Sequence, residues 1–201
     1  MRDLRLDLAL VHYPVVNRRG ETIGSAVTNL DLHDIARAGR TYGVGTYWVV
    51  TPFARQRELA RRIIGHWTEG YGSRANPDRC SALAIIRVCS GLDEAVAAMT
   101  ERWGMRPMLV ATCARPGEKE VAFHALRQRL SESRPVLLLF GTAWGLDPEL
   151  LARADASLPP ICGPGDYNHL SVRSAAAIVL DRLLGCRESE GQKTGNREGC
   201  A

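Results

Sequence analysis

Two glycine-rich segments in the second half of the chain could build a ligand pocket largely from main-chain groups. Residues 137–146, LLLFGTAWGL, run from an apolar strand pattern into a turn that Gly141 and Gly145 bracket. Residues 164–183, PGDYNHLSVRSAAAIVLDRL, open with a glycine-containing loop and continue as a long apolar helix pattern. Because glycine permits positive φ angles and close approach to a ligand, these loops predict a pocket for a nucleoside-containing cofactor. A tight structural loop with Trp144 as a packing residue is the alternative interpretation.

A second group of polar residues lies on one helical segment near the start of the chain. His33, Arg37 and Arg40 follow one another at spacings of four and three, so they share one face of that helix. Arg37 also follows Asp34 by three residues. A surface ion pair between those two residues, worth only about 0.2–0.5 kcal/mol, is the simpler explanation for the pattern.

The elements that must position these residues alternate along almost the entire chain. We expect strands at residues 6–13, 47–51, 84–88, 108–112, 136–140 and 158–161, and helices at 32–42, 59–67, 92–103, 118–130 and 171–184. The expected helix caps are Asp31, Ser90, Asp147 followed by Pro148, and Asn168 or Ser171, with Gly43 ending the first helix. This alternation predicts an α/β domain with a mostly parallel sheet that has helices on both faces.

The ligand of an open α/β sheet lies beyond the carboxyl ends of its strands. Three loops rich in glycine or small residues follow such ends here, at residues 112–115, 141–145 and 162–165. We therefore expect them to converge on one edge of the sheet.

Two segments fall outside the alternating pattern. Residues 68–79, TEGYGSRANPDR, are polar and are expected to form a loop, either an RNA-contacting flap or an ordinary connection. Residues 187–201 have little to bury, so we expect a disordered tail after one domain that spans residues 1–186.

Composition excludes several classes of protein. No apolar run approaches the roughly 20 residues that a membrane-spanning helix needs, and Asp7 and His12 interrupt the apolar start, unlike a signal peptide. The six cysteines form no CxxC pair and no zinc-type cluster, so reduced thiols and no metal are expected. Of the 26 basic residues only Lys119 and Lys193 are lysine, and a GC-rich genome explains this bias as readily as RNA binding does. The expectation is a cytoplasmic protein.

The phosphate-binding motifs of the common nucleotide-binding folds are missing from the sequence. There is no GxGxxG after the first predicted strand and no GxxxxGK[ST], which argues against a dinucleotide-binding Rossmann domain and a P-loop NTPase. No GxSxG supports a hydrolase.

Taken in order, the three segments resemble the motifs of the SPOUT superfamily of RNA methyltransferases. DLHDIARAGRTYGV looks like the first motif, in which an Asn or Asp precedes an arginine by six residues, and Asp31 and Arg37 take those places. LLLFGTAWGL is similar to the second motif and LPPICGPGDYNHLSVRSAAAIVL to the third, while MLVATCARP resembles a Thr-x-Ala-Arg segment of some members. The likeness covers roughly residues 5–185 and is strongest to a stand-alone branch of the superfamily.

This resemblance implies properties that the sequence pattern alone does not give. They are a deep trefoil knot in the C-terminal segment, a homodimer, and S-adenosylmethionine (SAM) bound in the knot loops. The implied cofactor-binding residues are Thr112, Gly141, Thr142, Trp144, Gly145, Leu146, Ile161, Gly163, Asn168, Leu170, Ser171 and Ala175.

The function that this resemblance implies is SAM-dependent methylation of RNA, with a base nitrogen of tRNA or rRNA as the expected acceptor. Arg37 would orient the target or its phosphate, Asp31 or Asp166 would be the base, and His33, Arg40 and Arg74 would contact the RNA. Ribose 2′-O-methylation is one alternative, although the second motif lacks the acidic residue of that branch and HLS replaces SLN in the third. A knotted SAM-binding protein without RNA methylation activity is the other alternative.

Overall fold

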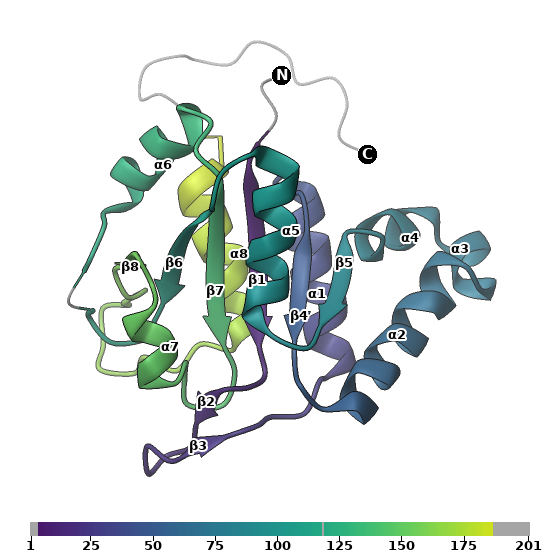
Figure 1. Ribbon diagram of the computed structural model, residues 1–201, viewed down its shortest axis with the longest axis horizontal. Coiled ribbons are helices and arrows are strands. Elements are labelled where there is room, and N and C mark those ends of the chain that lie inside the picture. Colours follow the sequence, from purple (N-terminus) through teal and green to yellow (C-terminus); the bar gives the residue numbers. More distant parts are fainter. Residues whose placement is uncertain (1–3, 118, 187–201) are drawn as a thin grey trace.

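A parallel six-stranded sheet forms the centre of the fold in the computed structural model, which describes residues 4–117 and 119–186 (Figure 1). The strands lie in the order β5-β4-β1-β7-β6-β8. Their bounds are β1 Leu6–Val11, β4 Tyr47–Val50, β5 Ile86–Cys89, β6 Met108–Thr112, β7 Val136–Gly141 and β8 Ala156–Leu158. A short antiparallel hairpin, β2 Val15–Val16 and β3 Thr22–Ile23, lies below the carboxyl ends of β1 and β7 in the view of Figure 1.

The two central strands are buried on both sides, which explains their lack of polar alternation. All six residues of β1 and the first five of β7 are buried. Along β1, Leu8 and Leu10 contribute to one hydrophobic core, whereas Ala9 and Val11 contribute to the other. The predicted α/β class with helices on both faces of a parallel sheet is therefore confirmed.

The helices divide between these two cores. They are α1 Asn29–Thr41, α2 Ala54–Thr68, α3 Tyr71–Ala75, α4 Pro77–Leu83, α5 Leu92–Trp103, α6 Phe123–Ser131, α7 Pro148–Ala152 and α8 Val172–Leu184. Buried residues of α1, α2, α4, α6 and α8 belong to one core, and those of α5 and α7 to the other. Figure 1 shows α5 in front of the sheet and α1 and α8 behind it.

Several predicted boundaries are wrong for identifiable physical reasons. The expected loop at residues 68–79 instead contains α3 and the start of α4, which Asn76 caps by accepting a hydrogen bond from the Arg79 N–H at 2.9 Å. Because α4 extends to Leu83, the next strand begins only at Ile86. The last strand ends at Leu158, and the two prolines that follow it cannot donate hydrogen bonds to a sheet.

The helix caps were predicted in part. Asp31 and Ser90 are not N-caps: Thr28 caps α1, and the cap position of α5 is occupied by Gly91. The expected helix at residues 118–130 is shorter and begins at Phe123. The predicted caps that the structure confirms are Asp147 with Pro148 at the start of α7, Ser171 at the start of α8, and Gly43, which follows α1 with a φ of +76°.

The predicted tail at residues 187–201 lies outside the described residues. Within residues 4–117 and 119–186, none of the helices combines the length and apolar character that crossing a membrane requires.

A buried carboxylate ties the centre of the sheet to α5. Asp7 on β1 is 1% exposed and accepts hydrogen bonds from the Trp48 indole at 2.9 Å and from the Thr46 N–H at 3.0 Å. Its third partner is the Arg102 guanidinium, which donates at 2.5 Å. Burial raises the pKa of Asp7, although Trp48 and Arg102 act in the opposite direction. The three donors therefore compensate for a carboxylate in an apolar position.

We expect Asp7→Ala to lower the free energy of unfolding by about 3 kcal/mol or more, because it leaves buried donors without an acceptor. Urea unfolding at neutral pH measures the change. The control is Asp93→Ala, which removes an ion pair between the exposed side chains of Asp93 and Arg153 and should cost less than about 1 kcal/mol. Equal losses in the two variants would contradict the structural role of Asp7.

Candidate functional site

A cavity of about 780 Å³ opens where the carboxyl ends of β6, β7 and β8 meet the amino-terminal ends of α1 and α8. Its size falls in the range of roughly 300–1,000 Å³ that is typical of small-molecule sites. We call it the donor cavity. It lies at the sheet edge where the sequence predicts three convergent loops, and residues 112–115 and 141–145 both contribute to its wall.

Most of the predicted binding residues line this cavity. They are Thr112, Gly141, Thr142, Trp144, Gly145, Ile161, Asn168, Leu170, Ser171 and Ala175, together with the predicted base Asp31. Two residues are placed elsewhere, which corrects the expectation that they line the site. Leu146 is 3% exposed and packs into the core on the α7 side of the sheet, and Gly163 is exposed away from the lining.

The loop after β7 owes both of its glycines to its own geometry. At Gly141 a side chain would bring its Cβ within 2.6 Å of the Leu146 nitrogen, so the loop closes tightly only around glycine. Gly145 has a φ of +114°, a conformation that other residues rarely adopt. Its carbonyl accepts from the Val16 N–H at 3.0 Å, and the Val16 carbonyl accepts from Trp144 at 3.0 Å. The glycines therefore shape the loop, and the loop shapes the cavity.

One wall of the cavity comes from a segment that the sequence analysis did not identify. Ser25, Ala26 and Thr28 lie between β3 and α1 and line the cavity. The hairpin that precedes them is anchored by Thr22, whose hydroxyl donates to the Asp147 carboxylate at 2.5 Å. The signal in the sequence that could have revealed this hairpin is the polar turn between β2 and β3. In the structure, the Asn17 side chain in this turn accepts hydrogen bonds from two backbone N–H groups.

Side-chain hydrogen bonds hold the other two loops together. The Asn168 amide donates to the Ala114 carbonyl at 2.9 Å, which joins the loop before α8 to the loop after β6. The Thr112 hydroxyl donates to the Leu139 carbonyl at 2.9 Å, which joins β6 to β7. Further lining residues are Cys113, Ala114, Arg115 and Ala143, which belong to the two predicted loops, and Phe140, Leu158, Pro159, His169, Val172 and Val179, which the prediction missed.

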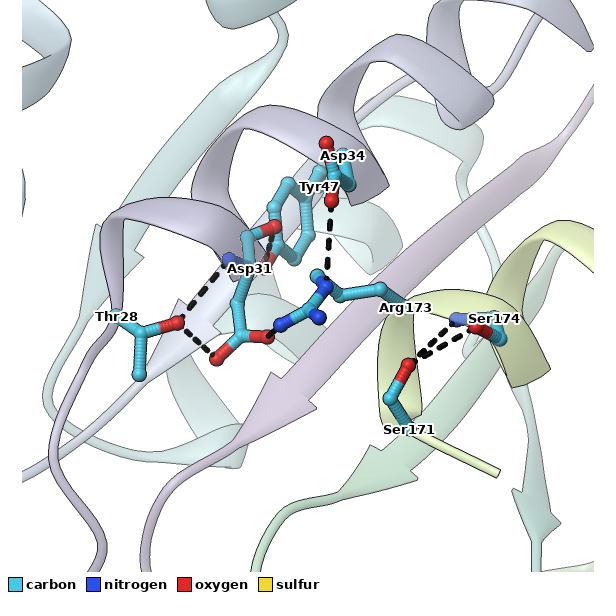
Figure 2. A network of polar contacts seen from close by, with 7 residues as sticks. All are labelled: Thr28, Asp31, Asp34, Tyr47, Ser171, Arg173 and Ser174. Carbon is cyan, nitrogen blue, oxygen red and sulfur yellow. Dashed lines mark hydrogen bonds and ion pairs between the residues drawn. The ribbon is translucent and has the colours of Figure 1, made fainter.

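Asp31 is held by a network that connects α1 to α8 (Figure 2). The Thr28 hydroxyl donates to one carboxylate oxygen of Asp31 at 2.6 Å, and Arg173 lies 3.5 Å from the other. Arg173 also pairs with Asp34 at 3.2 Å. Tyr47, which is wholly buried, donates to the Asp31 carbonyl at 3.4 Å. The carboxylate thus has a fixed position in the cavity wall, only 6% exposed.

A chain of hydroxyl groups leads from the cavity wall to a buried histidine. The Thr142 hydroxyl donates to the Val11 carbonyl at 3.1 Å, so Ser25 must donate to Thr142 across the 2.5 Å contact between their oxygens. Ser25 then accepts from Nδ1 of His12 at 3.0 Å. His12 is therefore the neutral tautomer protonated on Nδ1, and its Nε2 has no hydrogen-bond partner among the described residues.

Exposed aromatic rings surround the mouth of the cavity. Trp144 is 53% exposed and Tyr167 is 80% exposed, and His169 lies between them with ring centroids 6.0 Å and 5.4 Å away. The Arg18 guanidinium lies 6.0 Å from the Trp144 ring. We call Trp144, Tyr167 and His169 the aromatic rim.

The remaining predicted site residues lie away from the donor cavity. Arg37 and Arg40 line a second cavity beside α4, and Asp34 pairs with Arg173 on α8, which corrects the simpler expectation of an Asp34–Arg37 ion pair. The ring of His33 packs edge-on against Trp67, with centroids 5.4 Å apart. Asp166 and Arg74 are exposed, and neither lines a cavity described above.

Among the described residues, neither the cysteines nor the potential metal ligands form a disulfide or a metal site. Five cysteines, Cys80, Cys89, Cys113, Cys162 and Cys186, are free, and Cys200 lies outside the described residues. Burial raises the pKa of the Cys113 thiol, so this cavity residue stays protonated at neutral pH. Within the described part of the chain, no group of three or more metal-ligating side chains comes together.

We expect the stability of the protein to fall between pH 6.5 and pH 4 because of His12. Burial lowers the pKa of His12 from 6.5 to about 4. Between these two pH values the unfolded chain binds a proton on His12 that the folded state does not bind, so protonation favours unfolding. The effect amounts to about 3 kcal/mol. His12→Asn should weaken this pH dependence in urea unfolding, whereas substitution of the exposed His124 should preserve it. An unchanged profile in His12→Asn would contradict the assignment.

Comparison with known proteins identifies the family. A family model described as SAM-dependent RNA methyltransferase matches residues 5–185. The chain is 50% identical over 177 residues to a tRNA (guanine-N(1)-)-methyltransferase of Oleidesulfovibrio alaskensis, with 88% of this chain and 41% of the relative covered. It is 41% identical to an uncharacterized protein of Aquifex aeolicus, with 88% and 87% covered.

A solved structure agrees with these sequence matches at the level of the fold. The SpoU methyltransferase AviRb from Streptomyces viridochromogenes, in complex with AdoMet, superposes with a TM-score of 0.57 at 17% identity, with 92% of this chain and 58% of that chain covered. The chain spans only 41% of the Oleidesulfovibrio relative, so the activity in that name belongs to a longer protein. The family match covers nearly the whole of this chain, which therefore belongs to this family of SAM-dependent RNA methyltransferases.

Proposed function

We propose that the protein transfers the methyl group of SAM to a base nitrogen of tRNA, with the donor cavity as the cofactor site. The observation that carries this proposal is the convergence of three loops around a cavity that has the Asp31 carboxylate in its wall. The name of the Oleidesulfovibrio relative, a tRNA (guanine-N(1)-)-methyltransferase, supports a base nitrogen as the acceptor.

The residues of the donor cavity fit this cofactor. Leu158, Ile161, Leu170 and Val179 give apolar surface for an adenine ring. Gly145 presents backbone without a side chain, and no atom lies within 4 Å of the place where its Cβ would be. These residues would hold the adenosine part of SAM.

The reaction needs alignment of two reactants and removal of one proton. SAM supplies a methyl group on a positively charged sulfur, which makes that carbon electrophilic. The acceptor nitrogen would bond to this carbon as the carbon–sulfur bond breaks and S-adenosylhomocysteine leaves, and Asp31 would accept the proton that the nitrogen gives up. Thr28 and Arg173 hold Asp31 in position, so the base does not have to reorganise during the reaction.

The aromatic rim supports a base rather than a ribose as the acceptor. Exposed aromatic rings can stack on unpaired bases, a common means by which proteins bind single-stranded RNA. Trp144 and His169 line the donor cavity itself, so a base stacked there would lie beside the cofactor. The absence of the acidic residue of the ribose-methylating branch from residues 141–145 agrees with this choice.

The remaining expectations are part of the same proposal. We propose that the segment after β8 is threaded as a trefoil knot before α8 packs against α1, that two copies form a homodimer, and that the protein acts in the cytoplasm. Resemblance to the SPOUT superfamily supports the knot and the dimer. Asp166 lies outside the cavity lining, so Asp31 is the better candidate for the base.

We expect Asp31→Asn to reduce methyl transfer by about 100-fold or more, because general-base catalysis contributes about 10²–10⁴-fold. SAM binding, measured by calorimetry, should persist because asparagine keeps the shape of the side chain. Asp34→Asn is the matched control, since Asp34 is exposed and pairs with the same Arg173; it should stay within a few-fold of wild type. If Asp31→Asn turned over as fast as Asp34→Asn, Asp31 would not be the base.

The product can be identified by comparing modified nucleosides in RNA from cells with and without the gene. Loss of a base-methylated nucleoside from the tRNA fraction is the expected result. Loss of a 2′-O-methylated nucleoside would instead identify a ribose methyltransferase. An unchanged profile, combined with tight SAM binding, would indicate a cofactor-binding protein that does not methylate RNA.

A further inference from the structure

His12 is a polar side chain in a fully buried position that the methyl-transfer reaction itself does not use. It directly follows β1 and is 0% exposed. Its Nε2 has no hydrogen-bond partner among the described residues. An unpaired buried nitrogen costs stability, and an apolar side chain of similar size would avoid that cost. The other ring nitrogen, Nδ1, is the part of the imidazole that makes a polar contact.

Ser25, in the wall of the donor cavity, is fixed to His12 by two hydrogen bonds. Nδ1 of His12 donates to the Ser25 hydroxyl at 3.0 Å, and the Ser25 N–H donates to the His12 carbonyl at 2.8 Å. Because the Ser25 hydroxyl accepts from His12, its own hydrogen is directed to the Thr142 hydroxyl, 2.5 Å away. Burial lowers the pKa of His12 to about 4, so the ring stays neutral near pH 7. His12 thereby sets the direction of the Ser25 hydroxyl.

Thr142 passes this constraint to the loop after β7. Its hydroxyl accepts from Ser25 and donates to the Val11 carbonyl at 3.1 Å, so the side chain is held from two sides. The next residue, Ala143, has a φ of +52°, a left-handed conformation that is unfavourable for a residue with a side chain. Such a conformation persists only where neighbouring contacts enforce it. Thr142 is one such neighbour, and Trp144, whose N–H donates to a β2 carbonyl at 3.0 Å, is the other.

We propose that His12 is a positioning residue for SAM: through Ser25 it holds Thr142, and with it the loop at residues 141–145, in the conformation that binds the cofactor. His12 does not line the donor cavity, whereas Ser25 and Thr142 do. This inference rests on the proposed function, since it takes the donor cavity as the SAM site. A protein whose binding-competent conformation is only partly populated binds its ligand more weakly in proportion. Loss of the Nδ1 donor should therefore weaken SAM binding and leave the chemical step unchanged.

The same contacts argue against His12 as a base in the reaction. Its lowered pKa makes the ring a poor proton acceptor at neutral pH. The chain of hydroxyls ends at the Val11 carbonyl, which is too weak a base to take up a proton. Asp31, the proposed base, is held by Thr28 and Arg173 instead. The chain from His12 therefore fixes atoms in place and moves no proton.

Two substitutions of His12 in the full-length protein test this role, with SAM binding measured by calorimetry and kcat measured at saturating SAM with total tRNA as the acceptor. His12→Leu removes the donor and should raise the Kd for SAM about tenfold, while kcat stays within about twofold of wild type. His12→Asn should bind SAM within about threefold of wild type, because its side-chain amide can donate from the place of Nδ1. Wild-type affinity in His12→Leu would overturn the inference, and so would equally weak binding by both variants.

Ser25→Ala gives a second measurement that does not depend on the folding of His12→Leu. It breaks the same chain and should also raise the Kd for SAM about tenfold. Because the two residues act in one chain, the double variant should bind SAM about as weakly as either single variant. If the two losses multiplied in the double variant, His12 would not act through Ser25 and the inference would be wrong.

Asp7→Asn is the control for a loss of stability alone. Asp7 is also buried on β1, but near the amino-terminal end of the strand, whereas the donor cavity lies at the carboxyl ends. This variant should unfold at a lower urea concentration and still bind SAM as wild type does. Equal weakening of SAM binding in Asp7→Asn and His12→Leu would overturn the positioning role. Absence of SAM binding by the wild-type protein would overturn the proposed cofactor site as well, whereas wild-type binding that survives in His12→Leu overturns this inference alone.

Discussion

The ion pair between Arg173 and the nearly buried Asp31 is the interaction on which the site depends most. Arg173 lies in the first turn of α8, and its partners Asp31 and Asp34 lie in the first turns of α1, far away in the sequence. A single guanidinium thus brings the amino-terminal ends of two helices together beside the donor cavity. Because Asp31 is nearly buried there, its charge requires a fixed partner, and the position of α8 is tied to that requirement.

The second constraint is the pairing between the loop after β7 and the hairpin near the start of the chain. Backbone hydrogen bonds join Val16 to Trp144 and Gly145, and the hydroxyls of Ser25 and Thr142 meet beneath the cavity wall. Neither segment alone has a regular structure that could hold the cavity open. Together they form a small layer at the carboxyl ends of the sheet.

The sequence predicted the sheet because its central strands are apolar without interruption, and it predicted the glycine loops because only glycine suits those turns. The prediction failed where the structure depends on contacts between residues that are far apart in the sequence. Thr28, rather than Asp31, caps α1 because the helix begins at Asn29, and Asp31 in its first turn pairs with Arg173 from the distant helix α8. The wall made by Ser25, Ala26 and Thr28 was missed because strands of two residues give almost no periodic signal. Likewise, Arg37 was assigned from its motif position, but which cavity it faces depends on α4, whose residues looked like a polar loop.

The place of β1 in the sheet has a consequence for how the protein emerges from the ribosome. On one side β1 pairs with β4, which is synthesised soon afterwards. On the other side it pairs with β7, so Leu6 cannot pair with Val136 until that much later residue has been synthesised. During translation at about 5–20 residues per second, a buried apolar strand therefore has an open edge for several seconds. Such an edge is a template for aggregation. A nascent chain with this topology would benefit from a chaperone that covers β1 until β7 arrives.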